Sequence, residues 1–140
     1  MEKTHEKKYT IREIGDYYNR VMPEVVKSIA ISDTMQAYRP VNIHELHNYI
    51  IETAELRDGQ TIFDAGCGLG GPARYFASKL DVRIFSWTNS FFTFQYFSDK
   101  LAVERAGHRG KVYPSLSDYH TAAQIFPPKT FDRVIFLESF

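Results

Sequence analysis

The stretch that decides the fold is Thr61-Ile62-Phe63-Asp64-Ala65-Gly66-Cys67-Gly68-Leu69-Gly70-Gly71. A short run of β-forming side chains leads into a loop dense in glycine, and Pro72 then suits the first turn of a helix. Glycines allow positive φ and remove Cβ atoms, so a ligand can lie directly on the backbone. The helix that follows would direct its first N–H groups at that ligand. The stretch predicts a strand, a ligand-binding loop and a helix.

The rest of the chain extends this pattern in both directions. Before the loop, Thr10 and Glu13 form a capping box for a helix with a break or kink at Pro23, and a second helix begins near Asn42. After the loop, strands are predicted at 82–87, 111–114 and 131–137, with a long helix at 90–106. Strands that alternate with helices indicate an α/β fold, a parallel sheet with helices on both faces. We expect a helical segment over 1–57 and a ligand-binding unit over 58–140.

Composition and charge exclude several classes of protein. The chain has 17 basic and 17 acidic residues, and this balance argues against binding nucleic acid through its phosphates. Its one cysteine, Cys67, cannot form an intrachain disulfide and suits a reducing compartment. The charged start shows no signal peptide, and the apolar run 91–97 is too short to span a bilayer. We expect a cytoplasmic protein without a membrane span.

Several ligands remain open for the glycine loop. Gly66, Gly68 and Gly71 fit the G-x-G-x-x-G dinucleotide fingerprint, which favours an NAD(P)-dependent oxidoreductase. That fingerprint includes an acidic residue after the second strand that binds the ribose, and this chain has Thr88 and Asn89 there. A carboxylate at the tip of the first strand, Asp64, suits a ligand with a cationic group better. The glycines are also compatible with a plain tight turn that binds no ligand. A further alternative is a non-catalytic interaction module that uses the exposed edge of the fourth strand and the aromatic helix 90–106 as a partner surface.

The loop also resembles a known family motif. The run 64–74 resembles motif I of the class I S-adenosylmethionine-dependent methyltransferases, and 131–139 looks like the fourth strand of their small-molecule branch, which includes sterol, tocopherol, sarcosine and cyclopropane-fatty-acid enzymes. The segments 117–119 and 17–19 resemble that branch's Gly-Asp-Phe and Tyr-Tyr-Asp motifs. The resemblance implies a Rossmann-like enzyme that transfers a methyl group from S-adenosyl-L-methionine to a small-molecule acceptor.

The resemblance also assigns roles to individual residues. Glu138 would face the acceptor as the catalytic residue, or would serve structurally by holding the glycine loop. Asp64 would pair with the ammonium group of the cofactor, and Asp118 would accept a hydrogen bond from the adenine amino group. In that branch the first helix forms a lid over the cofactor. The complete cofactor set lies on this helix, on the first strand and its glycine loop, and on the two turns after the second and third strands: Tyr17, Tyr18, Asp64, Ala65, Gly66, Cys67, Gly68, Gly70, Thr88, Asn89, Asp118 and Tyr119.

Other reactive side chains have structural explanations. Cys67 is expected to be a small buried hydrophobe rather than a nucleophile. His44 and His47 are three residues apart without the rest of a zinc motif, so we expect no metal site. His120 is expected to be a solvated loop residue, with a position in a pocket as the alternative. Thr93 occupies a slot where several relatives have Gln, and it stays outside the assignment.

The family's sheet has seven strands in the order 3-2-1-4-5-7-6, and this sequence supplies 3-2-1-4. Strand four would then be an open apolar edge, which natural proteins avoid. We therefore expect a piece of a longer protein, inactive as a methyltransferase alone, or a chain that self-associates through this edge.

Overall fold

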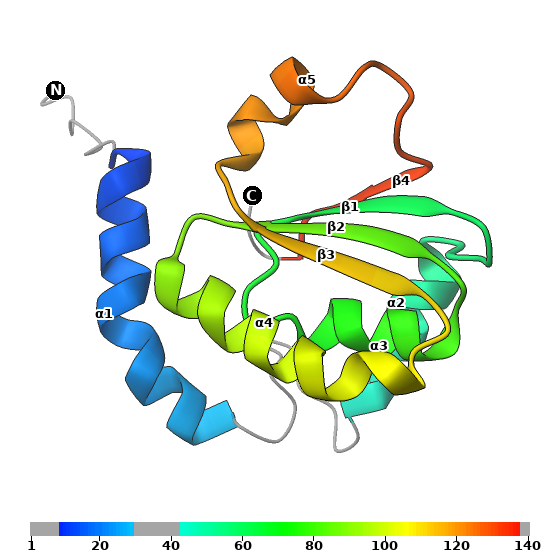
Figure 1. Cartoon of the computed structure of the whole chain (residues 1–140), viewed down its shortest axis with the longest axis horizontal. Helices are drawn as coiled ribbons and strands as arrows, with labels where there is room; N and C mark the ends of the chain where they lie inside the picture. Colours follow the sequence, from blue (N-terminus) through cyan, green and yellow to red (C-terminus); the bar gives the residue numbers. More distant parts are fainter. Residues whose placement is uncertain (1–8, 30–42, 138–140) are drawn as a thin grey trace, which may run out of the picture.

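The computed structural model describes residues 9–29 and 43–137 (Figure 1). Along the chain, its regular elements are α1 (Ile11–Ile29), α2 (Ile43–Thr53), β1 (Thr61–Ala65), α3 (Gly71–Lys79), β2 (Arg83–Thr88), α4 (Phe91–Glu104), β3 (Lys111–Leu116), α5 (Ala122–Ile125) and β4 (Arg133–Ile135). Two short 3₁₀ turns, η1 (Arg105–Gly107) and η2 (Tyr119–Thr121), follow α4 and β3.

The four strands form one parallel sheet in the order β3-β2-β1-β4. Phe63 of β1 lies opposite Phe85 of β2 and Val134 of β4, so β1 is at the centre of the sheet. This order confirms the predicted α/β class and strand arrangement. Parallel strands place their carboxyl ends at one edge of the sheet, where ligands bind in folds of this kind.

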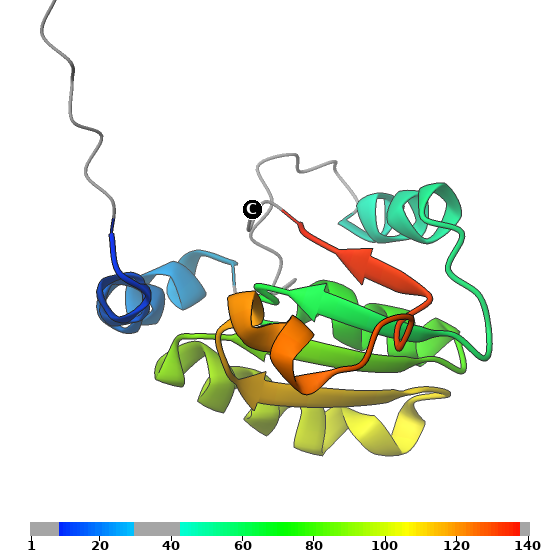
Figure 2. The ribbon, with the colours of Figure 1, turned by 90° about the horizontal axis from the view of Figure 1, so that it is seen from above.

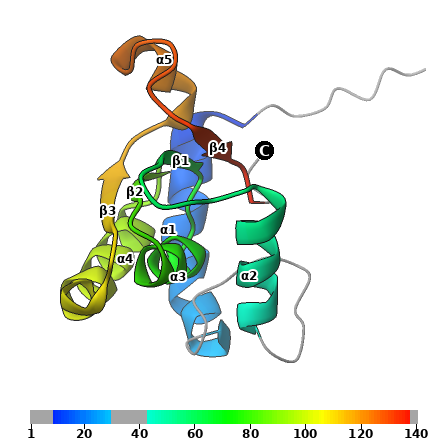
Figure 3. The same cartoon turned by 90° about the vertical axis from the view of Figure 1, so that its right-hand side faces the viewer.

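One face of the sheet is covered by α2, α3 and α4 (Figures 1 and 3). Aliphatic strand residues pack there against helix side chains, with Ile62, Ile84, Phe76, Ala77 and Phe97 fully or almost fully buried. Tyr75 of α3 also donates a hydrogen bond to Asn48 Oδ1 of α2 at 2.8 Å. This face supplies the main apolar core beneath the glycine loop.

The opposite face is aromatic and carries the short helix α5 (Figure 2). Phe63 stacks on Phe131 with their ring centroids 5.2 Å apart, and it meets Trp87 edge-on with centroids 5.3 Å apart. The ring centroid of Phe126, which follows α5, lies 5.6 Å from that of Trp87. Offset and edge-to-face pairs of this kind add to the stabilisation from burial. The two faces of the sheet therefore hold separate apolar clusters.

Two of the predicted strands differ in length from the structure. β4 covers Arg133–Ile135 instead of 131–137, because Asp132 bonds the start of β1: its carboxylate accepts from the Thr61 N–H and its own N–H donates to the Thr61 carbonyl, both at 2.8 Å. Phe131 meanwhile turns into the aromatic cluster. β3 extends to Leu116, beyond the expected end at Pro114.

The helix α1 begins as predicted and does not end at its proline. Thr10 and Glu13 form the capping box, with Glu13 Oε2 accepting from the Thr10 N–H at 2.7 Å and Thr10 Oγ1 accepting in return at 3.2 Å. The helix continues through Pro23 to Ile29. The expected cap of α2, Asn42, lies outside the described residues. Across 9–29 and 43–137, no helix combines the length and apolar character needed to cross a membrane.

Candidate cofactor site

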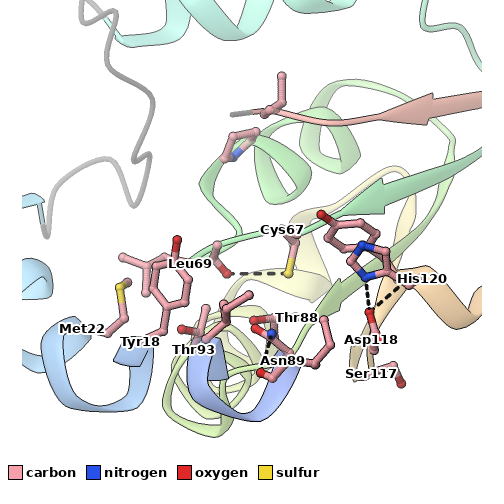
Figure 4. A pocket seen from close by; sticks show the side chains of 17 residues that line it. Tyr18, Met22, Cys67, Leu69, Thr88, Asn89, Thr93, Ser117, Asp118 and His120 are labelled. Carbon is pink, nitrogen blue, oxygen red and sulfur yellow. Dashed lines mark hydrogen bonds and ion pairs between the residues drawn. The ribbon is translucent and has the colours of Figure 1, made fainter. Parts of the chain in front are cut away.

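A hollow of about 330 Å³ lies at the carboxyl ends of β1, β2 and β3, beside α1 (Figure 4). Its volume is at the lower end of the range for small-molecule sites. The polar residues Asp118 and His120 lie at one end, and Tyr18, Met22 and Leu69 lie at the other, with Cys67, Thr88 and Asn89 between them. The remaining lining residues are Ile11, Ile14, Gly66, Gly68, Pro72, Thr93, Ser117, Tyr119 and Leu137.

The glycine loop forms the central wall of this hollow. Gly66, Gly68 and Gly70 have φ values of 72°, 56° and 82°, a backbone region that L side chains rarely adopt. The N–H groups of Gly66 and Cys67 both donate to the Trp87 carbonyl at 3.0 Å, which ties the loop to the end of β2. The backbone N–H of Gly68 has no acceptor among the described residues, so it is available to a ligand.

Asp64, in β1, is not in the lining of the hollow. The residue is only 6% exposed, and its carboxyl accepts a hydrogen bond from Ser86 Oγ at 3.3 Å. Burial raises the pKa of Asp64 to about 7, because the charged form loses its hydration. Burial likewise raises the pKa of the Cys67 thiol, which therefore stays protonated and unreactive.

Two residues of the helix α1, Asn19 and Gly15, are in close contact with the turn after β2. Asn19 Oδ1 accepts from Ser90 Oγ at 2.9 Å and from the Phe92 N–H at 3.0 Å, so a residue of α1 helps to cap α4. Gly15 faces the same turn, and a Cβ atom there would lie 2.6 Å from the Asn89 carbonyl oxygen. These contacts hold Ile14 and Tyr18 of α1 against the hollow.

The polar end of the hollow is built by the turn after β3. Asp118 Oδ1 accepts from the His120 backbone N–H at 2.9 Å and lies 2.7 Å from His120 Nδ1. The carbonyl of Asp118 accepts from the Thr121 N–H at 3.0 Å and from Thr121 Oγ1 at 2.7 Å. Because Oδ1 takes both bonds, Asp118 Oδ2 remains as an acceptor for a ligand.

The structure brings most of the predicted cofactor residues together. Of the predicted set, the hollow is lined by Tyr18, Gly66, Cys67, Gly68, Thr88, Asn89, Asp118 and Tyr119. Tyr17 points elsewhere: half of its surface is exposed, and Arg20 lies 5.8 Å from its ring centre. Asp64, Ala65 and Gly70 are not in the lining, and Glu138 lies outside the described residues. The roles assigned to these residues stay predictions.

Sequence reasoning missed several lining residues. Thr93 is buried and its Oγ1 donates to Ser90 Oγ at 2.9 Å, whereas Gln95, two residues on, is exposed and bonds Asp99. Met22 continues the spacing of Ile11, Ile14 and Tyr18, which is equally typical of core packing. Among these residues, the position of His120 was the easiest to predict. An Asp side chain often accepts a hydrogen bond from the backbone N–H two residues later, which would fix His120 in the turn beside Asp118.

Comparison with known proteins agrees with this geometry. Residues 43–140 match the family described as mycolic acid cyclopropane synthetase. The chain is 28% identical over 94 residues to (S)-tetrahydroprotoberberine N-methyltransferase of Eschscholzia californica, covering 66% of this chain and 25% of that protein. It is 29% identical over 92 residues to sterol 24-C-methyltransferase of Eremothecium gossypii, covering 66% and 24%. The chain thus spans about a quarter of the length of these relatives.

Solved structures show the same fold. The [4+2]-cyclase SpnF superposes with a TM-score of 0.72 at 23% identity, covering 89% of this chain and 48% of the cyclase. Coclaurine N-methyltransferase bound to N-methylheliamine and SAH gives 0.53 at 22% identity, covering 74% and 30%. These likenesses establish the fold, and the family match covers more than half of the chain. The chain belongs to the mycolic acid cyclopropane synthetase family.

Proposed function

We propose that this chain is the cofactor-binding part of an S-adenosyl-L-methionine-dependent methyltransferase that acts on a small-molecule acceptor. One observation carries the proposal. A single hollow at the ends of three parallel strands collects the glycine loop, the Thr88–Asn89 turn and Asp118. Family membership supports it, and so do the relatives whose names are those of methyltransferases.

The residues present fit this cofactor better than NAD. Asp118 Oδ2 can accept from an adenine amino group, and the Gly68 N–H can donate to a carboxylate or a ribose oxygen. The end of β2 carries Thr88 and Asn89 where a dinucleotide site places an acidic residue for the ribose. Asp64, predicted to attract the cofactor's ammonium group, is buried and is not in the lining of the hollow, so that role stays a prediction.

Methyl transfer requires little acid–base chemistry from the protein. The bound cofactor supplies a methyl group already activated by the positive sulfur. The chain's own residues therefore have to orient the two reactants and exclude water. Tyr18 and Met22, held over the hollow by the seat of α1, are placed to do this. A base is needed only where the acceptor loses a proton, and the prediction for Glu138 leaves open whether it is a base, a cation stabiliser or a structural residue.

The apolar end of the hollow points to the character of the acceptor. Ile14, Tyr18, Met22, Leu69 and Leu137 offer hydrocarbon, aromatic and thioether surface. Two of the relatives are named for a sterol and for tetrahydroprotoberberine, both compounds with large apolar surfaces. We propose an acceptor of this kind, small and largely apolar.

Calorimetry of the 140-residue chain with S-adenosylhomocysteine and with NAD⁺ tests the proposal. We expect binding of the first ligand and none of the second. Gly68→Val should abolish binding, because a branched side chain would enter the hollow at a position with φ of 56°. Gly107→Val is the matched control, since a Cβ at Gly107 meets nothing within 4 Å and that residue is not in the lining.

Binding of NAD⁺ alone would favour an oxidoreductase, and binding of neither ligand would favour a non-catalytic interaction module. Methyl transfer has to be measured separately, because the same fold is found in a [4+2]-cyclase. In an active full-length enzyme, Glu138→Gln should lower kcat while cofactor affinity stays nearly unchanged. Equal loss of cofactor binding in this variant would reassign Glu138 to scaffolding.

Two further parts of the proposal concern the chain's surroundings. We propose a cytoplasmic location, in keeping with the single cysteine. We also propose self-association through the edge strand β4, where Val134 of the strand and Phe136 just after it expose about half of their surfaces. Size-exclusion chromatography should show dimers or larger species, and a clean monomer would contradict the second part.

A further inference from the structure

A buried arginine contacts the glycine loop from outside the hollow. Among the residues that the structure describes, Arg74 of α3 is the only buried arginine, with 7% of its side chain exposed, and it does not line the hollow. Its Nη2 donates a hydrogen bond to the Leu69 carbonyl oxygen at 3.4 Å, and its guanidinium carbon lies 6.0 Å from the ring centre of Phe97. A buried guanidinium is costly unless its N–H groups are bonded and a partner of opposite charge is near.

The partner of opposite charge is Glu104, the last residue of α4. Arg74 Nη1 lies 2.7 Å from Glu104 Oε1, and 41% of the Glu104 side chain is exposed. The other carboxylate oxygen, Oε2, lies 3.8 Å from Nε2 of His108, whose side chain is only 5% exposed. The ion pair therefore holds the guanidinium between the end of α4 and the glycine loop.

The Leu69–Gly70 peptide is held at both of its polar groups. Arg74 bonds the Leu69 carbonyl, and the Gly70 N–H donates to the Cys67 carbonyl at 3.2 Å. In a trans peptide these two groups share one plane and point in opposite directions, so the two bonds together prevent rotation of that plane. The peptide lies in the wall of the hollow, because Leu69 lines it (Figure 4) and follows Gly68, whose N–H is available to a ligand.

We propose that Arg74 is a positioning residue, which holds the Leu69–Gly70 peptide and thereby keeps the glycine loop in its ligand-binding shape. Without this bond, the peptide plane can rotate about two single bonds, one of them at a glycine. The loop would then have to be ordered when the ligand binds, and that ordering would cost affinity. The inference rests on the proposed function, because the ligand used to test it is S-adenosylhomocysteine.

Two substitutions separate this role from a simple tie between α3 and α4. Arg74→Met removes both contacts and leaves an apolar side chain in the buried site, so stability should change little. Its affinity for S-adenosylhomocysteine should fall about tenfold, the net contribution of one hydrogen bond. Glu104→Ala removes the ion pair but keeps the bond to Leu69, and it leaves the guanidinium buried without its partner. It should therefore lose more stability than Arg74→Met and less affinity.

The matched control is Arg109→Met. The guanidinium of Arg109 has the same two kinds of partner, a backbone carbonyl and a carboxylate: Nη1 donates to the Lys79 carbonyl at 2.8 Å, and Nη2 lies 3.1 Å from Asp58 Oδ2. None of these three residues lines the hollow. Affinity measured by calorimetric titration and stability measured by urea unfolding should therefore separate the two arginines, with unchanged affinity in Arg109→Met.

Wild-type affinity in Arg74→Met would overturn the inference. Weaker binding by Glu104→Ala than by Arg74→Met would also overturn it, because affinity would then follow the stability of the contact between the helices. Failure of the proposed function is a different result, in which the wild-type chain binds no S-adenosylhomocysteine. Hydrogen exchange of the unliganded chain tests Arg74 even then. The Gly70 amide should exchange about tenfold faster in Arg74→Met and at the wild-type rate in Arg109→Met, and an unchanged rate in Arg74→Met would overturn the inference.

Discussion

The carboxyl group of Asp64 makes the stability of this chain depend on pH in a way that can be worked out in advance. Asp64 lies near the end of the central strand and is 6% exposed, and its carboxyl accepts one hydrogen bond from Ser86 Oγ. Burial raises its pKa from 3.8 to about 7. Between these two values, the folded chain keeps a proton that the unfolded chain releases, so unfolding becomes more favourable as the pH rises.

The size of the effect follows from the shift. Each pKa unit corresponds to about 1.4 kcal/mol, so a shift of about three units amounts to roughly 4 kcal/mol in the free energy of unfolding. The contribution is fully present below about pH 4, is lost as the pH rises to about 7, and changes no further above that. Asp64→Asn removes the titration and leaves a neutral side chain of nearly the same shape.

The assay is urea unfolding at pH 4, 5, 6, 7 and 8, followed by the fluorescence of Trp87, the single tryptophan of the chain. The difference in unfolding free energy between wild type and Asp64→Asn should fall by roughly 4 kcal/mol between pH 4 and 7. Burial lowers the pKa of His47 to about 4, so its protonation destabilises the fold over the same range. Because both proteins contain His47, that effect cancels in the difference.

Asp58→Asn provides a control of opposite sign. The Asp81 N–H and Arg109 stabilise the charged form of Asp58 and lower its pKa. Its stabilising effect is therefore present above the unfolded pKa and is lost as the pH falls. A difference between wild type and Asp64→Asn that does not vary with pH would refute the reasoning, because Asp64 would then titrate alike in the folded and unfolded chains.

Two glycine substitutions test close contacts in the fold. Gly70→Ala would place a Cβ atom against the ring of Phe97, at a residue with φ of 82°. It should lower the free energy of unfolding, measured by heat or urea, by about 1–3 kcal/mol more than Gly59→Ala, because Gly59 has a similar φ and open space around it. Equal losses in the two variants would contradict the contact with Phe97. Gly15→Ala should weaken S-adenosylhomocysteine binding about tenfold by lifting α1 from the Asn89 carbonyl, whereas a gain of about 1 kcal/mol in stability with unchanged binding would mean that α1 is not seated there.

Local patterns in the sequence determine much of this structure. The strand Thr61–Ala65 is bounded by a turn and a glycine loop, so both of its ends are marked and the prediction was confirmed. The strand order follows from the family resemblance and was confirmed as well. The start of β4 was misplaced because it depends on a bond between Asp132 and Thr61, which are distant in the sequence.

The site was likewise predictable where its residues are close together in the sequence, and not where it depends on contacts between distant residues. The glycine loop and the Thr88–Asn89 turn carry local signals, and the structure brings them together in one hollow. The contact between Asn19 and the start of α4 joins residues more than seventy positions apart, and no spacing rule indicates it. The burial of Asp64 could not be predicted either, because the sequence places this residue near the strand end without showing which way its carboxyl faces.

The Asn19 contact ties the folding of α4 to the arrival of a distant segment. One backbone N–H in the first turn of α4, that of Phe92, donates to a side chain on α1. Whenever α1 lifts, this amide loses its acceptor and exchanges its hydrogen with water. The exchange rate of this amide, relative to that of an unprotected amide, therefore reports the fraction of molecules in which α1 is lifted from the hollow, in the absence of any ligand or label.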